Sequence, residues 1–149
     1  MENLINQLSI EATEHTPAIL FDVENNTYSI VGISVPENSH KVYEPVISWI
    51  NDVLGNNRPS SDVMMVDVNL KYFSTTSAKY LLKIINAFST MCLYHNIKLT
   101  VQWYYHEEDE DMHDAGDLLH KLSGQHHAYL HLPRDNTTVP LILCCGTNT

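Results

Sequence analysis

The sequence predicts a single domain of the α/β class. Its 149 residues, 44% of them hydrophobic, are enough for one continuous core. Stretches with the two-residue alternation of strands are followed by stretches with the three-and-four spacing of helices. Strands that are joined through helices usually lie parallel, with right-handed crossovers. We therefore expect a mixed β-sheet of about four to five strands, flanked by about three α-helices.

The first two strands are predicted to form an N-terminal hairpin. Two extended runs, TPAILFDVE and TYSIVGISV, flank the pair Asn25 and Asn26. In the first run Ile19 and Phe21 alternate with other residues, as in a strand with one buried face. Asparagine tolerates the positive φ that a tight turn requires, so the pair is suited to the connection.

A helix and a central strand follow. The segment SHKVYEPVISWINDVLG has apolar residues at spacings of three and four, which indicates an amphipathic helix that ends near Gly55. Its apolar positions are Val42, Val46, Trp49, Ile50 and Val53. In VMMVDVNLKYF, residues 63–68 form a mostly continuous apolar run. Such a run is typical of a strand covered on both faces, so we expect the central strand of the sheet here.

Another helix, strand and helix complete the order. Helical spacing continues from Ala78 to about His95, and IKLTVQWYY then alternates as a strand. The segment HEEDEDMHDAGDLLHKLSG is expected to begin a third helix. Its predicted buried face consists of Met112, Ala115, Leu118, Leu119 and Leu122. We assign residues 1–124 to this domain and residues 125–149 to a C-terminal extension, in which HHAYLHL is a candidate edge strand and the remainder has too little pattern to assign.

Composition argues against several classes of protein. The formal net charge is −10 and no basic run occurs, which argues against nucleic acid as the main partner. No apolar segment approaches the roughly 20 residues of a membrane span, and the N-terminus lacks the pattern of a signal peptide. Cys92, Cys144 and Cys145 are odd in number and two are adjacent, which is a poor disulfide framework. We expect a cytoplasmic protein without direct membrane insertion.

A cluster of hydroxyl side chains separates the central strand from the second helix. Ser74, Thr75, Thr76 and Ser77 are consecutive, although capping a helix needs only one hydroxyl. Ser74 is suited to the N-cap position, and threonine is a mediocre helix former. A phosphate on a first-turn hydroxyl would lie near free amide protons and the positive end of the helix dipole. From the residues alone, a capping cluster and a phosphorylation site both remain open.

Four blocks of the sequence resemble the SiaC family of regulatory phosphoproteins. The blocks SIEATEHTPAILFD, PENSHKVYEPVISWI, LKYFSTTSAKYLLKI and VQWYYHEEDEDMHDAGDLL agree with it in order and spacing, over residues 9–122. The resemblance implies a fold like the STAS domains of anti-sigma factor antagonists. The family's phosphothreonine lies in a Tyr-x-Asn-Thr-Ser-Ser block, which matched onto YFSTTS implies Thr75 as the acceptor. This chain departs from that block at Ser74 and Thr76, and these are the alternative acceptors.

The resemblance also implies a function. The unphosphorylated protein would bind and activate a diguanylate cyclase, and so promote cyclic di-GMP synthesis and biofilm or aggregation behaviour. A partner Ser/Thr kinase would phosphorylate the threonine and release the cyclase, and a partner phosphatase of the PPM type would reverse this. The expected protein is therefore a binding module and not an enzyme, with no cofactor and no metal. No particular oligomeric state is implied.

The expected partner-binding residues surround the hydroxyl cluster. Some lie in the matched blocks, and two tyrosines are expected to end a strand near the same edge of the sheet. Together they are Tyr72, Ser74, Thr76, Ser77, Lys79, Glu37, Asn38, Tyr104 and Tyr105.

Two other functions compete with this interpretation. One is a constitutive scaffold or dimerisation module in which no hydroxyl is phosphorylated. The other is a metal-dependent hydrolase that uses the carboxylates and histidines of residues 106–114. The spacing in that segment matches neither a calcium loop nor a closed zinc site, and carboxylates before a helix are favoured by its dipole. The chain also offers no Gly-rich phosphate loop and no nucleophile elbow.

Overall fold

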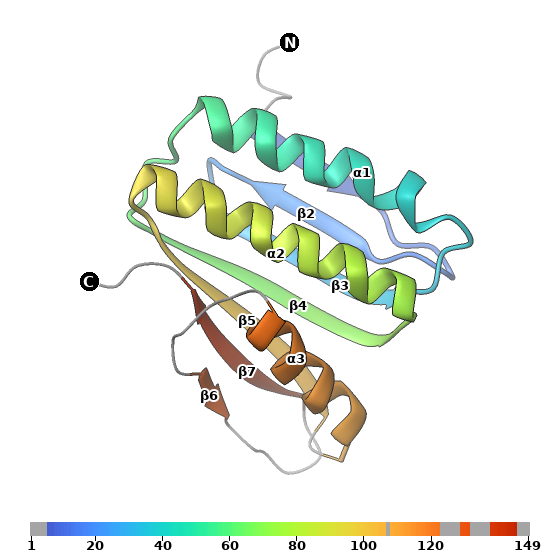
Figure 1. The fold of residues 1–149 in the computed structure, drawn as a ribbon. Coiled ribbons are helices and arrows are strands. Elements are labelled where there is room, and N and C mark those ends of the chain that lie inside the picture. The colour runs from blue at the N-terminus through green and yellow to red at the C-terminus, as the bar shows by residue number, and fades with distance from the viewer. Residues whose placement is uncertain (1–5, 107, 123–128, 132–137, 146–149) are drawn as a thin grey trace.

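A computed structural model describes residues 6–106, 108–122, 129–131 and 138–145 of the chain. It confirms the α/β class, with one seven-stranded mixed sheet in the order β1-β2-β3-β4-β5-β7-β6 (Figure 1). The strands are β1 (Gln7–Ile10), β2 (Ala18–Asp22), β3 (Thr27–Ser34), β4 (Val63–Phe73), β5 (Lys98–His106), β6 (Tyr129–His131) and β7 (Thr138–Cys145). The helices are α1 (Ser39–Trp49), which continues into the π-helical turn η2 (Ile50–Leu54), α2 (Thr75–His95) and α3 (Glu110–Leu122).

The sheet has more strands than the sequence predicts. The predicted hairpin is confirmed, since β2 pairs antiparallel with β3 and Asn26 in its turn has a φ of 52°. The additional strand β1 precedes the hairpin and pairs antiparallel with β2. The predicted edge strand after Gly124 is present as β6, but the unassigned segment beyond it supplies β7, which lies between β5 and β6. β7 is held by pairing with β5, a non-local contact that sequence periodicity does not report, whereas β1 has only four residues in which to show a pattern.

Three parallel strands bring the starts of the three helices to one edge of the sheet. β3, β4 and β5 are parallel neighbours, so their carboxyl ends lie together. The next element after each of these strands is α1, α2 and α3 respectively. The carboxyl edge of an open α/β sheet is where functional loops usually lie. The hydroxyl cluster, between β4 and α2, is therefore at this edge.

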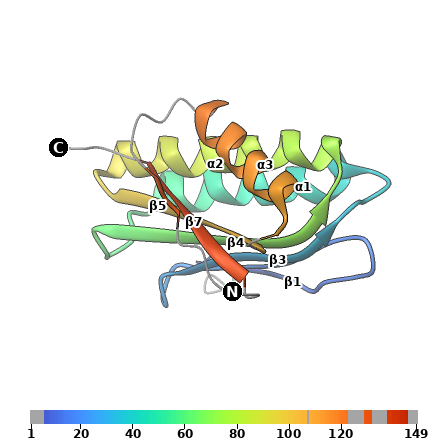
Figure 2. The same ribbon diagram turned by 90° about the horizontal axis from the view of Figure 1, so that it is seen from below.

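All three helices cover the same face of the sheet (Figure 2). The strand order β3-β4-β5 proceeds in one direction, so successive right-handed crossovers place α1 and α2 on the same side. As a result the burial of side chains alternates along β4. Met64, Val66 and Val68 are buried under the helices, whereas Val63 and Met65 are exposed on the opposite face. The prediction that this strand is covered on both faces is therefore wrong.

The core between sheet and helices is rich in aromatic side chains. Phe21 of β2 contacts the rings of Tyr28, Trp49 and Phe88, with the Phe88 ring edge-on at 5.1 Å. Below α3, the indole Nε1 of Trp103 donates a hydrogen bond to the backbone carbonyl of Met112, at 2.9 Å. Aromatic contacts of this kind contribute beyond their buried area and fix the positions of the helices.

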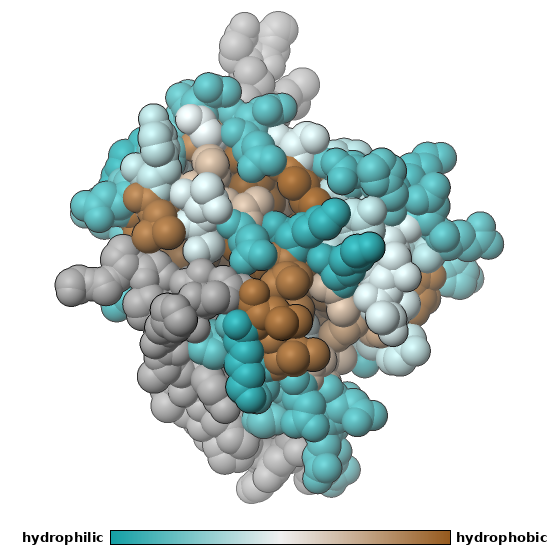
Figure 3. All heavy atoms as spheres, viewed as in Figure 1, coloured by the Kyte–Doolittle hydropathy of each residue, from teal (hydrophilic) through white to brown (hydrophobic). Residues whose placement is uncertain are grey.

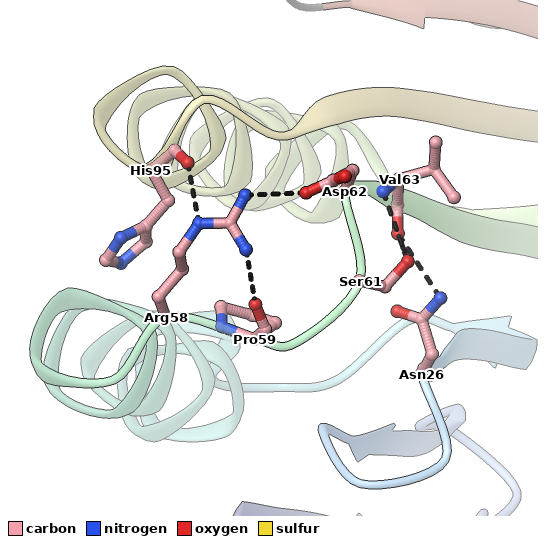
Figure 4. A network of polar contacts seen from close by, with 7 residues as sticks. All are labelled: Asn26, Arg58, Pro59, Ser61, Asp62, Val63 and His95. Atoms are coloured by element: carbon pink, nitrogen blue, oxygen red, sulfur yellow. Dashed lines mark hydrogen bonds and ion pairs between the residues drawn. The ribbon is translucent and has the colours of Figure 1, made fainter.

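At the amino ends of the parallel strands, opposite the hydroxyl cluster, polar side chains join neighbouring elements (Figure 4). The Arg58 guanidinium donates through Nε to the carbonyl of His95 at 2.9 Å, and it pairs with Asp62 at 3.0 Å. The side-chain amide of Asn26 donates to the carbonyl of Val63 at 3.2 Å. These contacts tie the end of α2 and the hairpin turn to the start of β4. Within the described residues, no helix combines the length and the apolar character of a membrane span.

Candidate functional site

The hydroxyl cluster begins where β4 gives way to α2. Ser74 has extended backbone angles and is the N-cap, since its Oγ accepts a hydrogen bond from the amide of Ser77 at 3.1 Å. Its own amide donates to the carbonyl of Ser34 at 2.9 Å. The predicted capping role of Ser74 is therefore confirmed, and the helix start is tied to the end of β3.

Ser77 is expected to contact a partner, but its side chain is fully buried. Its hydroxyl donates to the carbonyl of Ser34 at 3.0 Å and accepts from the hydroxyls of Ser34 and Ser74, at 2.7 and 3.1 Å. One donated and two accepted bonds use the full capacity of a hydroxyl. The Tyr43 hydroxyl, a further hydrogen-bond partner of Ser34 Oγ, extends the network into α1. Burial raises the pKa of Tyr43, although the hydroxyls of Ser34 and Ser77 act in the opposite direction.

The remaining two hydroxyls, those of Thr75 and Thr76, are exposed. Both residues lie in the first turn of α2, where backbone amides have no acceptor within the helix. The amides of Ser74 and Ser77 are satisfied as described above, so those of Thr75 and Thr76 are the ones left to bind water or an anion. The fold therefore divides the cluster into two structural serines and two accessible threonines.

Other expected partner-binding residues surround these threonines on the surface. Tyr72 and Lys79 are exposed before and after the cluster, and Glu37 and Asn38 are exposed at the start of α1. Asn38 caps that helix, because its Oδ1 accepts from the amide of Lys41 at 3.1 Å. The starts of α1 and α2 thus present one accessible surface.

The two tyrosines of β5 point to opposite faces of the sheet. Tyr105 is buried on the helix-covered face, where its ring meets that of His113 at 5.1 Å. Tyr104 lies on the uncovered face, where burial and the charge of Asp67 raise its pKa. Burial also raises the pKa of Asp67, partly offset by a hydrogen bond from Gln102 at 2.8 Å. Neither tyrosine is therefore brought onto the exposed surface of the threonines.

The acidic segment stabilises the start of α3. Asp109 Oδ1 accepts a hydrogen bond from the amide of Met112 at 3.0 Å, and Glu110 and Asp111 occupy the first turn. Negative side chains here interact favourably with the helix dipole. Among the residues that the structure describes, no three His, Cys, Asp or Glu side chains come together as metal ligands.

An apolar groove runs between α2 and α3, beside Thr75. Its volume is about 320 Å³. Two of the leucines that line it, Leu118 and Leu122, are 55% and 57% exposed, so their prediction as part of a buried face is wrong. The pattern of α3 is helical as expected, but the helix is placed so that only Met112, Gly116 and Leu119 of its apolar side are fully covered. The groove has no local sequence signal, because its walls come from two separate helices.

Comparison with models of protein families identifies the family to which this chain belongs. The model of the SiaC family regulatory phosphoproteins matches residues 10–129 of the chain. The chain belongs to the SiaC family. The resemblance to the SiaC family is thereby confirmed.

Relatives of this SiaC-family chain come from Pseudomonas aeruginosa. The uncharacterized protein PA14_02130 of strain UCBPP-PA14 is 29% identical over 107 residues, which cover 71% of this chain and 81% of that protein. The crystal structure of apo-SiaC has a TM-score of 0.67 at 24% identity, covering 77% of this chain and 90% of that one. SiaC in the crystal structure with the diguanylate cyclase SiaD, of which it is the activator, has a TM-score of 0.67 at 25% identity, covering 76% and 90%.

Replacing Ser77 with alanine is expected to destabilise the fold. The substitution removes the donor to the Ser34 carbonyl and the acceptor for two other hydroxyls, all in a buried place. Leaving such groups unsatisfied costs about 1–3 kcal/mol of unfolding free energy. Urea unfolding checks this, with Thr76→Ala as the matched control, for which we expect a change within about 0.5 kcal/mol. Equal stability of the two variants would contradict the structural role of Ser77.

Proposed function

We propose that this chain is a phosphorylation-switched binding module whose unphosphorylated form binds and activates a diguanylate cyclase. Membership of the SiaC family supports the regulatory role. The activator that was crystallised with the cyclase SiaD supports the class of partner, since it shares 25% identity and the fold with this chain. In this proposal the chain acts in the cytoplasm, controls cyclic di-GMP synthesis and has no catalytic activity of its own.

The division of the hydroxyl cluster is the observation that carries the phosphorylation site. A kinase needs an accessible hydroxyl, and Thr75 and Thr76 are the exposed ones, whereas Ser74 caps the helix and Ser77 is buried. Thr75 also lines the apolar groove between α2 and α3. A phosphate on Thr75 would therefore alter a surface that a partner can contact. We take Thr75 as the acceptor, with Thr76 as the alternative.

The switch would act through charge and leave the fold unchanged. Phosphothreonine carries about −1.5 to −2 charges at neutral pH. The free amides of the first turn and the positive end of the helix dipole hold such a group at low cost. Lys79 lies four residues after Thr75, on the same side of α2, and pairs with the phosphate across one helical turn. The phosphate then adds negative charge to a surface whose charged residues are Lys79 and Glu37, and an acidic partner dissociates.

A kinase and a phosphatase of the type that governs anti-sigma factor antagonists complete the proposed cycle. They set the fraction of chains that carry the phosphate, and so the fraction of cyclase that is active. Of the expected partner-binding residues, the exposed ones are Tyr72, Thr76, Lys79, Glu37 and Asn38, and we propose that these form the partner-binding surface together with Thr75.

Mass spectrometry of the protein from its native cells tests the proposed acceptor. We expect one phosphate, mapped to Thr75 by peptide fragmentation and removed by phosphatase treatment. A chain with Thr75→Ala, expressed in the same cells, is the control and should lack the mass shift. A phosphate on Thr76 would move the acceptor by one residue. Absence of phosphate in every growth condition would contradict the switch and favour the constitutive scaffold, and stoichiometric bound metal would favour the hydrolase.

A further inference from the structure

The parallel pairing of β4 and β5 stops before either strand ends. Their register ends at Val68 opposite Trp103, whereas the strands continue to Phe73 and His106. Beyond this point β4 remains paired with β3, and β5 remains paired with β7. The backbone N–H and C=O groups that β4 and β5 direct toward each other there have no ladder partner among the described residues. They are therefore left to bind water or a ligand.

A cavity lies in this opening between the two strands. Its volume is about 260 Å³, and it is lined by residues 69–71 of β4, by residues 104–106 of β5, and by Asp109 and Met112 at the start of α3. A second cavity, of about 220 Å³, adjoins the first and shares Lys71, Asp109 and Met112 with it. Together they fall within the range of small-ligand sites, roughly 300–1,000 Å³. They also lie at the carboxyl edge of the sheet, where open α/β sheets bind their ligands.

The residues that the two cavities share carry charges of both signs. Lys71 is exposed and has no ion pair with any residue that the structure describes. Asp109 uses Oδ1 to accept from the Met112 amide at 3.0 Å, and a carboxylate has acceptor capacity beyond one such bond. Figure 3 shows hydrophilic surface around the start of α3. A ligand with one negative and one positive group would complement both residues, whereas an anion would be repelled by Asp109 and a cation by Lys71.

The two cavities differ in the side chains that they do not share. The first is lined further by hydrogen-bonding side chains, those of Asn69, Tyr104 and His106. The second is lined further by rings and a methyl group, those of Tyr72, Phe73 and Ala115, with one more carboxylate, that of Asp111. Burial and the charge of Asp67 raise the pKa of Tyr104, so its hydroxyl remains a donor at neutral pH. A compact ligand with a charged head and a short apolar side chain matches this division.

We propose that the opening between β4 and β5 binds a free α-amino acid with an apolar side chain. Its carboxylate pairs with Lys71, its ammonium group pairs with Asp109, and its side chain enters the second cavity beside Phe73. The same two groups of the ligand also bond to the N–H and C=O groups that the strands leave without a ladder partner. This site goes beyond the proposed function and does not depend on it. It gives a role to Tyr104, which the fold keeps away from the exposed threonines.

Titration of the isotopically labelled full chain with L-leucine, L-methionine or L-phenylalanine, followed by NMR, tests the site. We expect saturable amide shifts at residues 69–71, residues 104–106 and Met112, with a dissociation constant of about 1 mM or tighter for at least one of the three. For L-leucine, 4-methylpentanoate lacks the ammonium group and isopentylamine lacks the carboxylate, so each should bind at least about 10-fold more weakly. Equal binding of 4-methylpentanoate would overturn the zwitterionic ligand. No saturable shift at these residues with any of the three amino acids, up to about 10 mM, would overturn the site.

Neutral variants of the two charged residues test the roles assigned to them. Lys71→Met keeps the length of the side chain, and Asp109→Asn keeps an Oδ1 that can accept from the Met112 amide. We expect each to weaken binding of the amino acid by about 10-fold or more, and Asp109→Asn to abolish the preference for L-leucine over 4-methylpentanoate. Lys98→Met and Asp114→Asn are the matched controls, since both residues are exposed and line neither cavity, and their affinity should be unchanged. Equal affinity of Lys71→Met and Lys98→Met, or a preference for L-leucine that survives Asp109→Asn, would overturn the proposed pairing.

Discussion

Thr75→Glu is expected to abolish most of the affinity for the cyclase, whereas Thr75→Ala should retain it and become insensitive to the kinase. Glutamate places one negative charge where the phosphate would place nearly two, at the rim of the groove and four residues before Lys79. A repulsive charge in such a contact costs several kcal/mol, so we expect a loss on the order of 30-fold or more. Titration calorimetry with purified cyclase measures it.

Thr90→Glu is the matched control for the charge. It adds the same carboxylate at another exposed threonine of α2, which is neither among the residues that line the groove nor in the proposed partner-binding surface. Its effect on affinity should stay below about 3-fold, in the range of a surface charge. In native cells, Thr75→Ala should keep the cyclase active whatever the phosphorylation conditions. Opposite effects of Ala and Glu support the switch, while two neutral variants would point to the constitutive scaffold.

Gly116→Ala is expected to destabilise the protein, although glycine to alanine in a helix is normally favourable. A Cβ atom at position 116 would lie 2.5 Å from Cδ1 of Trp103 and 2.7 Å from its Nε1. The Trp103 ring is buried and bonded to Met112, so it cannot move aside without disturbing α3. Overpacking of this kind costs about 1–3 kcal/mol, more than the ~1 kcal/mol that alanine contributes to a helix.

Gly55→Ala is the matched control for Gly116→Ala. Its added Cβ would meet only the Met91 sulfur, at 3.6 Å, and its φ of −70° suits any residue. We expect Gly55→Ala to be neutral or slightly stabilising, and Gly116→Ala to lower the melting temperature by roughly 2–4 °C for each kcal/mol of stability lost in a chain of this size. Equal melting temperatures would mean that α3 moves away from Trp103 easily. Because α3 forms one wall of the groove, the Gly116→Ala variant should also bind the cyclase less tightly.

Patterns in the sequence predicted those elements that depend on residues close together in the chain. The alternation around Phe21 and the two asparagines predicted the hairpin, and the backbone of Asn26 takes the positive φ that its residue type permits. The capping role of Ser74 followed from its residue type and position. The strands β1 and β7 escaped prediction, since β1 has only four residues in which to show a pattern and β7 pairs with β5, a strand distant in sequence.

Residue types also indicated the position of the candidate site, but not which of its hydroxyls are structural and which are accessible. Four consecutive hydroxyls between a strand and a helix marked a position where phosphate could be held, and the resemblance to the family's block implied Thr75 as the acceptor. Which hydroxyls were structural depended on Ser34 and Tyr43, more than 30 residues away in the chain. Only the packing of β3 against the start of α2 buries Ser77 and leaves Thr75 accessible.

The sequence by itself determined the α/β class, the three helices, the cap at the start of α2 and the family, since each depends on spacing or residue type along one stretch. The tertiary structure alone decided which face of each element is covered. It placed all three helices on one side of the sheet, which exposed Met65 on the other, and it set α3 so that Leu118 and Leu122 face a groove. Burial depends on the neighbour that an element meets, and helical periodicity specifies an apolar side without specifying that neighbour.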